Sequence, residues 1–280
     1  MKRLALALTA ALLLAPGAFA TPWITSLTAA QKKAKDSKQL IFVDLFADWC
    51  GWCKKMEQEV FPSQAFQTAT DKMVLLRLNT EDGADGSKIS QQFSVSSLPT
   101  FLILTPDNMI AAMIRGYAPS KEFVDSMKES LQKYNDFQNR VAHESTIAGD
   151  YQKRLDLARE FTSRFGLKDS ESRFRKLITE RAAPVDVRDQ AYYELAVSLL
   201  LQNRLDDATK TLVAFGKAET KGEAYERSRI LLAQVYMQQG NFLGAANELR
   251  AFKAQFPNSP LMRNVEIMLP GIERQLQQKR

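Results

Sequence analysis

An apolar segment at residues 40–47 (LIFVDLFA) constrains the fold of this chain more than any other feature. Its apolar residues are interrupted only at Asp44, so the pattern predicts a strand that is buried on both faces. Residues 73–78 (MVLLRL) and 100–104 (TFLIL) have the same character, and residues 109–114 predict a fourth strand. Strands of this kind require a sheet that is covered by helices on both sides.

Helical patterns alternate with these strands. The predicted helices cover residues 24–36, 50–61, 87–93 and 119–134. Alternation of helix and strand favours parallel pairing, whereas the last two strands follow each other directly and predict a hairpin. The first half of the chain is therefore predicted to be an α/β domain with a mixed sheet.

The second half, after about residue 140, has helical periodicity and no predicted strand. It contains an internal repeat with an offset of 37 residues. The matched pairs are Leu195 and Leu232, Ala196 and Ala233, Asn203 and Gly240, Leu205 and Phe242, Ala208 and Ala245, Leu212 and Leu249, and Phe215 and Phe252. This pattern resembles the tetratricopeptide repeat, with a generic helical bundle as the alternative. An earlier helical pair, at about residues 151–181, matches it poorly.

The first twenty residues have the pattern of a secretory signal peptide: Lys2 and Arg3, an apolar run at residues 4–15, and small residues around position 20. The apolar run is shorter than the ~20 residues that span a bilayer, although an uncleaved anchor is the alternative. We therefore predict a periplasmic protein without a stable membrane anchor. The predicted divisions are residues 1–20 (signal peptide), 21–140 (α/β domain) and 141–280 (helical domain).

Composition excludes several classes of function. The formal charge is +6 and is not concentrated in one run, so nothing favours nucleic acid as a partner. Cys50 and Cys53 are the only cysteines and His143 is the only histidine, too few for a structural zinc site or a disulfide-stapled scaffold. A c-type haem site would need histidine where Lys54 stands. We expect neither a metal nor another cofactor.

The chemistry is concentrated in the Cys50-Gly51-Trp52-Cys53 segment, where a predicted strand leads into a predicted helix. A helix N-terminus favours the thiolate of the first cysteine, and the second lies one turn further on, within bonding reach. Such a pair exchanges disulfides: one sulfur attacks a substrate disulfide and the other resolves the product. A purely structural disulfide is the remaining alternative.

Two more residues fit this chemistry. Asp44 lies inside an apolar strand, where burial should raise its pKa and suit it to carry the proton of Cys53. The alternative is that Asp44 points outward at a strand end. Pro99 precedes the strand at residues 100–104, and a cis Leu98–Pro99 bond would turn the backbone of Leu98 towards the cysteines and an extended substrate. The sequence leaves cis and trans both open.

The segments FVDLFADWCGWCKKMEQEVF and SSLPTFLIL resemble the thioredoxin superfamily, and KKMEQEVF is similar to the branch that includes the C-terminal domain of DsbD. The resemblance covers about residues 24–134. It implies a nucleophilic Cys50, a resolving Cys53, Asp44 as buried proton carrier and Pro99 as cis-proline. The pair Gly-Trp replaces the Gly-Pro of thioredoxin, which leaves the direction of electron flow open.

We further expect a substrate-binding surface at Trp49, Gly51, Trp52 and Leu98. Two functions follow. The first is a periplasmic thiol-disulfide oxidoreductase, for which we favour the direction of a reductase, with a helical partner-binding domain. Its partners would be proteins with thiols or disulfides and a redox protein that supplies or accepts electrons. The second is a chaperone-like adaptor whose helical repeats bind partners and whose dithiol is only a redox switch.

Overall fold

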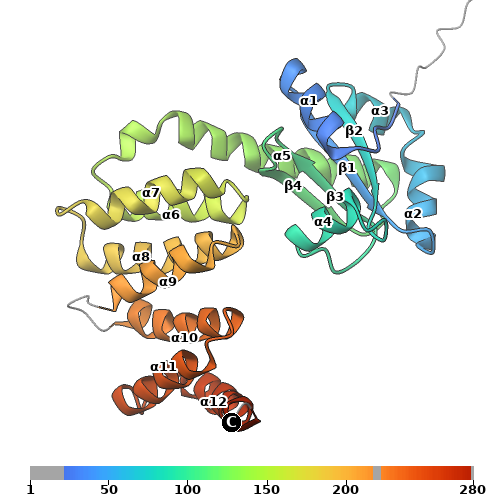
Figure 1. Ribbon diagram of the computed structural model, residues 1–280. Coiled ribbons are helices and arrows are strands. Elements are labelled where there is room, and N and C mark those ends of the chain that lie inside the picture. The colour runs from blue at the N-terminus through green and yellow to red at the C-terminus, as the bar shows by residue number, and fades with distance from the viewer. Residues whose placement is uncertain (1–21, 217–221, 279–280) are drawn as a thin grey trace, which may run out of the picture. The chain divides into compact units, whose positions relative to one another are not determined.

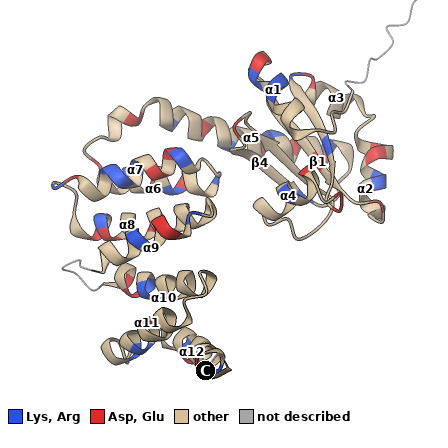
Figure 2. Ribbon diagram, viewed as in Figure 1, with Lys and Arg blue, Asp and Glu red and all other residues tan. Residues whose placement is uncertain are grey.

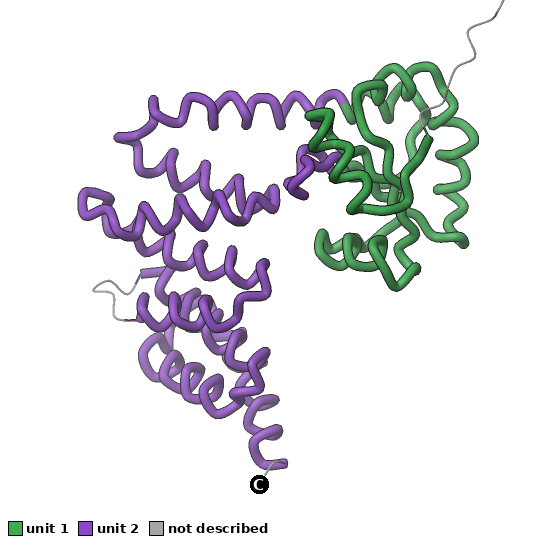
Figure 3. The backbone as a smooth tube through the Cα atoms, turned by 45° about the horizontal axis from the view of Figure 1, so that its top comes forward, with its two compact units in different colours: residues 1–102, 114–127 green, residues 103–113, 128–280 purple. Residues whose placement is uncertain are grey.

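The computed structural model of the protein describes residues 22–216 and 222–278 (Figure 1). The predicted signal peptide lies outside the described residues. The chain divides into two compact units: one contains residues 1–102 and 114–127, and the other contains residues 103–113 and 128–280 (Figure 3). Within the described part of the chain, no helix is both long enough and apolar enough to cross a membrane.

The predicted mixed four-stranded sheet is confirmed, with the strand order β2-β1-β3-β4. Its strands are β1 (Leu40–Phe46), β2 (Met73–Asn79), β3 (Thr100–Leu104) and β4 (Ile110–Arg115). Strands β1 and β2 are parallel, and their register places Asp44 opposite Arg77. The ends of β3 and β4 exchange hydrogen bonds as in a hairpin, since Gly116 N donates to Pro99 O at 2.8 Å.

Helices complete the α/β part of the chain. They are α1 (Leu27–Ser37), α2 (Gly51–Lys55), the π-helical turn η1 (Met56–Val60), α3 (Gln64–Thr70), α4 (Asp85–Gln92) and α5 (Ser120–Ala142). Both alternating sets of side chains in β1 are buried, which requires cover on both faces of that strand. One set includes Phe42, whose ring lies 5.2 Å from Phe66 of α3 and 6.3 Å from Phe123 of α5. These aromatic contacts contribute much of the core on that face.

The structure differs from the predicted helices at several points. The first helix begins at Leu27 rather than at residue 24, because Ile24 forms a β-bridge with Leu76, and α4 covers residues 85–92 rather than 87–93. Helix α3 was not predicted, although Ser63 caps it by accepting a hydrogen bond from Phe66 N. The predicted helix at residues 50–61 divides into α2 and η1. Helix α5 continues eight residues beyond Tyr134, because Phe137 extends its apolar face and packs 4.9 Å from Phe161.

The second half of the chain is all-helical, as predicted. After a 3-10 turn, η2 (Glu144–Ile147), it contains α6 (Tyr151–Ser163), α7 (Leu167–Thr179), α8 (Val185–Leu201), α9 (Leu205–Phe215), α10 (Glu223–Gln238), α11 (Phe242–Gln255) and α12 (Met262–Gln278). The 37-residue offset relates the pair α8–α9 to the pair α10–α11. Asn203 and Gly240, which match in the sequence, both have positive φ, 56° and 73°, in the turns between the helices of each pair.

Helices α6 and α7 form an earlier pair with the same design. Phe165 lies in their turn with a φ of 59° and precedes Asn203 by 38 residues. At this offset Leu157-Ala158 matches Leu195-Ala196, and all four are buried. The sequence pattern is weak here because Phe165 occupies a left-handed position that glycine and asparagine adopt more readily.

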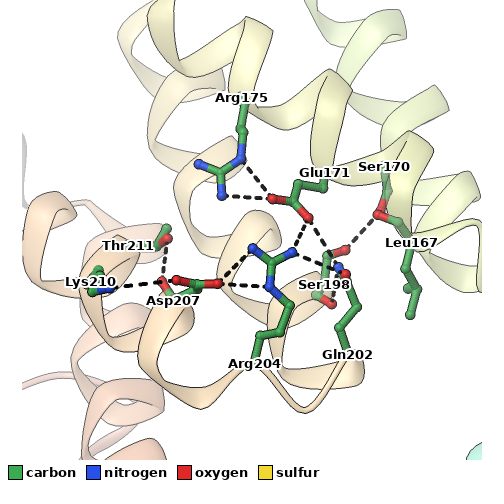
Figure 4. A network of polar contacts seen from close by, with 10 residues as sticks. All are labelled: Leu167, Ser170, Glu171, Arg175, Ser198, Gln202, Arg204, Asp207, Lys210 and Thr211. Carbon is green, nitrogen blue, oxygen red and sulfur yellow. Dashed lines mark hydrogen bonds and ion pairs between the residues drawn. The ribbon is translucent and has the colours of Figure 1, made fainter.

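A polar network around Glu171 links α7 to α8, to the turn that follows α8 and to α9 (Figure 4). Basic and acidic residues are interspersed along α6–α9 (Figure 2). Glu171 accepts from Arg175 at 2.8 Å and from Arg204 at 2.6 Å, and Arg204 also pairs with Asp207 at 2.7 Å. Burial alone would raise the pKa of Glu171, but the hydrogen bonds from the two guanidinium groups outweigh it and hold that pKa below its ordinary value.

We expect Glu171→Gln to lower the free energy of unfolding at neutral pH by on the order of 1 kcal/mol, because two charge-assisted bonds are lost at a partly exposed site. A depressed folded-state pKa gives stability that is present above the unfolded value of 4.5 and is lost as the pH falls through the folded value. Urea unfolding followed by circular dichroism should therefore show the difference shrinking as the pH falls below 4.5. The matched control is Glu129→Gln, which removes an exposed pair with Lys133. A deficit as large in that variant would contradict the assignment.

Candidate active site

Cys50 and Cys53 lie together at the start of α2, as the sequence predicts. Cys50 is the N-cap residue, and its Sγ accepts a hydrogen bond from Cys53 N at 3.1 Å. The two sulfurs form a disulfide of 2.01 Å with a Cα–Cα distance of 5.2 Å. The cysteines are only 3% and 2% exposed. The N-cap position offers Cys50 Sγ a backbone donor and the positive end of the helix, both of which favour a thiolate once the disulfide opens.

Two tryptophans flank Cys50 in the sequence and are open to solvent. Trp49 is 68% exposed and Trp52 is 57% exposed. Trp49 Nε1 donates a hydrogen bond to Glu81 Oε1 at 2.7 Å, in the loop after β2. Gly51 is exposed between them. Two exposed aromatic rings and an exposed glycine thus adjoin the nearly buried sulfurs in the sequence.

Asp44 is 1% exposed in β1, which excludes the alternative that it points outward at a strand end. Burial raises its pKa to about 7, while the positive charge of Arg77 lowers it and the negative charge of Glu57 raises it. Its Oδ1 has no hydrogen-bond partner, and its Oδ2 lies 3.2 Å from Arg77 Nε. Arg77 Nε also lacks a hydrogen bond, so the contact is a charge pair without hydrogen-bond geometry. A carboxyl group whose pKa is close to neutral pH is suited to take up and release a proton.

Arg77 is a site residue that the sequence analysis missed. The parallel register of β1 and β2 places Arg77 beside Asp44. Its guanidinium group also lies 4.1 Å from the ring centroid of Phe46 and bonds to Glu57 of η1. Glu57, Arg77 and Lys54 line a surface cavity, so solvent reaches the ion pair that contacts Asp44. The isolated arginine in an otherwise apolar β2 was the available signal.

Pro99 precedes β3, and its peptide bond with Leu98 is cis, which the sequence left open. Pro99 is buried and Leu98 is partly exposed. The turn is closed by Thr100 Oγ1, which donates to Ser97 O at 2.7 Å.

Residues 22–216 and 222–278 contain no cluster of three or more His, Cys, Asp or Glu side chains that could hold a metal ion. His143 follows α5, where its Nδ1 lies 2.8 Å from Asn139 O.

The family described as "Thioredoxin-like domain" matches residues 27–143. These residues therefore form a thioredoxin-like domain, with helices following it in the chain. The chain is 28% identical over 110 residues to the thiol:disulfide interchange protein DsbD of Actinobacillus pleuropneumoniae serotype 5b, covering 38% of this chain and 19% of that protein. It is 37% identical over 82 residues to DsbD of Pseudomonas fluorescens, covering 29% and 14%. The matched segments thus span less than a fifth of these relatives.

Several solved structures are similar to part of this chain, among them the following two. The first is described as "DsbH Oxidoreductase", with a TM-score of 0.36, 16% identity, and coverage of 44% of this chain and 95% of that one. The second is the oxidised C-terminal domain of DsbD from Neisseria meningitidis, with a TM-score of 0.35, 14% identity, and coverage of 39% and 99%.

Proposed function

We propose that the protein is a thiol-disulfide oxidoreductase that exchanges disulfides with protein substrates. The observation that carries this proposal is the Cys50–Cys53 disulfide at the N-terminus of α2 in a thioredoxin-like domain. A disulfide that closes so short a loop adds little entropic stabilisation, which favours a redox role over a structural one. The buried Asp44, with its pKa near 7, supports the same reading because the exchange needs a proton acceptor.

The proposed reaction begins with the reduced pair. The thiolate of Cys50 attacks one sulfur of a substrate disulfide, forming a mixed disulfide and releasing the other substrate sulfur as a thiolate that takes a proton from solvent. Cys53 passes its proton to Asp44 and attacks Cys50 Sγ, which releases the second substrate thiolate. Two electrons have then moved from the protein to the substrate, and the Cys50–Cys53 disulfide is restored. A dithiol partner protein must reduce it again before the next cycle.

Trp49, Gly51, Trp52 and Leu98 form the substrate-binding surface in this proposal. The two tryptophans and Gly51 are exposed around Cys50, and Leu98 precedes the cis-proline with its backbone available for pairing with an extended segment. The helical domain, residues 141–280, binds a protein partner through tetratricopeptide-like repeats. The recurring helical pairs with a left-handed turn residue support this assignment.

The protein acts in the periplasm in this proposal, in the direction of a reductase. The signal-peptide pattern of residues 1–20 supports the location, and the resemblance to thioredoxin and to the C-terminal domain of DsbD is the basis for the direction. The test is equilibration of the Cys50–Cys53 pair against a dithiol buffer, with the oxidised fraction read from thiol-alkylated protein. A reductase predicts a potential near that of thioredoxin, about −270 mV, whereas about −120 mV would reverse the direction. A pair that does not equilibrate at all would contradict thiol-disulfide exchange itself.

A further inference from the structure

Four side chains near the dithiol form a connected cluster that the exchange chemistry does not use. Trp52 and Lys55 come from α2, Glu59 comes from η1, and Tyr117 follows β4. We call these four residues the aromatic bracket. The rings of Trp52 and Tyr117 are stacked, with centroids 5.3 Å apart and planes inclined by 27°.

Charged groups hold the bracket in place. Lys55 Nζ lies 4.7 Å from the ring centroid of Tyr117 and 5.6 Å from that of Trp52. The hydroxyl group of Tyr117 donates to Glu59 Oε2 at 2.5 Å, and Glu59 lies 3.8 Å from Lys55 Nζ. Each ring is therefore fixed by at least two contacts. Because the rings are ordered in advance, a ligand that stacks on them does not have to immobilise them.

Trp52 stays more than half exposed in spite of these contacts. It follows Cys50 by two residues, in the first turn of α2, so the ring belongs to the same turn of chain as the sulfur that attacks the substrate. Large aromatic side chains that are both rigid and exposed are typical of recognition surfaces. The position of Trp52 fits contact with residues close to the substrate cysteine.

The charges of the bracket define what it can accept. Lys55 already occupies the position over both rings that a cationic side chain would take, and Glu59 balances the charge of Lys55. The position over the rings is therefore taken, and the neutral Lys55–Glu59 pair offers no net charge that would attract a second cation or an anion. The complementary group is therefore uncharged and planar or large and apolar.

We propose that the aromatic bracket is a specificity site that contacts an aromatic or large apolar side chain next to the substrate's cysteine. The proposal rests on the proposed function. Trp52 touches the substrate, whereas Tyr117, Lys55 and Glu59 are positioning residues that hold its ring. The favoured substrates are segments with an aromatic residue beside the disulfide, and segments with lysine or serine there are disfavoured.

The test uses the full reduced protein and four disulfide-linked peptide dimers. The dimers differ only in the residue before cysteine, which is tryptophan, leucine, serine or lysine. Bis(2-hydroxyethyl) disulfide serves as a reference without a side chain. Rates of protein oxidation are measured by acid quenching and chromatography. We expect the tryptophan peptide to react about three- to tenfold faster than the serine peptide. The lysine peptide should be the slowest of the four.

Variants separate recognition from reactivity because each is judged by the ratio of the tryptophan-peptide rate to the reference rate. Trp52→Ala and Tyr117→Ala should abolish the preference for tryptophan, whereas Tyr117→Phe should keep most of it because the ring remains. The matched control is Tyr193→Ala, which removes a ring that lies under Arg227 on the helical part of the chain and should leave the ratio unchanged.

Two failures are distinguishable. A wild-type protein that reacts with the reference disulfide but shows equal rates for all four peptides would overturn this inference and leave the proposed function standing. The same conclusion follows if Trp52→Ala and Tyr117→Ala keep the full preference. A wild-type protein that reacts with neither the peptides nor the reference would overturn the proposed function and this inference together.

Discussion

Replacement of Cys50 by serine is expected to lower disulfide turnover by at least about a thousandfold, because Cys53, inside α2, lacks the N-cap position that activates Cys50. Cys53→Ser should have a different effect: Cys50 still attacks, but the mixed disulfide persists because nothing resolves it. Turnover is measured as the reduction of a protein disulfide with dithiothreitol as electron donor. Trapped mixed disulfides appear as slower-migrating species on non-reducing gels that disappear on reduction.

The double variant, with both cysteines replaced by serine, controls for non-covalent binding and should form no trapped species. Ordinary turnover by the Cys50→Ser protein would contradict the proposed enzyme. If the double variant still suppressed the aggregation of other proteins, the chaperone-like adaptor would be the better account of the helical domain. The two variants together thus separate the two functions that the sequence leaves open.

Asp44→Asn is expected to stabilise the protein in a pH-dependent way. The folded-state pKa is raised from 3.8 to about 7, so the wild-type protein is most stable below the unfolded value and loses stability as the pH rises from about 4 to about 7. Asparagine has no such loss. The advantage of the variant should therefore grow by on the order of 4 kcal/mol between pH 4 and pH 8. Urea unfolding at several pH values measures it, with the exposed Asp107→Asn as the control.

The same variant should be a poorer catalyst. Without a carboxylate to accept the proton of Cys53, the resolving step should slow by about a hundredfold. The wild-type rate should rise as the pH passes about 7, where Asp44 loses its proton, and this inflection should be missing in Asp44→Asn. Arg77→Gln removes the charge that lowers the pKa of Asp44, so it should move the inflection to higher pH. An inflection unmoved by either change would exclude Asp44 as the titrating group.

The strands and the dithiol are predictable from sequence because their signals are local. Residues 40–47 and 100–104 do not alternate between apolar and polar residues, as a strand with one face in solvent would. Two cysteines at a strand-to-helix junction have few alternative uses. The pairing of Asp44 with Arg77 is not local, since it depends on the register of two parallel strands. Once β1 and β2 were predicted as parallel neighbours, aligning their apolar residues would have brought the two charges together.

In the helical half, the residue type at one turn makes the first helical pair hard to recognise in the sequence. Asn203 and Gly240 mark their turns because both residue types adopt positive φ readily. Phe165 adopts the same left-handed conformation, which is costly for a bulky residue, and its residue type gives no sign of a turn. A single sequence read for local propensity therefore misses the first pair.

The π-helical turn η1 determines the directions in which two acidic side chains, Glu57 and Glu59, leave one short helix. A π turn carries one residue more than an α turn, and Phe61 N accordingly reaches back to Met56 O. Within that widened turn, Glu57 points to Arg77 and the buried acid, while Glu59, two positions later, points to Tyr117. Removal of one residue here would let the backbone form a regular α-helix, and the directions of Glu57 and Glu59 relative to each other would then change. In the proposed function, the additional residue of this turn therefore sets how Glu57, which contacts Arg77, is oriented relative to Glu59, which contacts Tyr117.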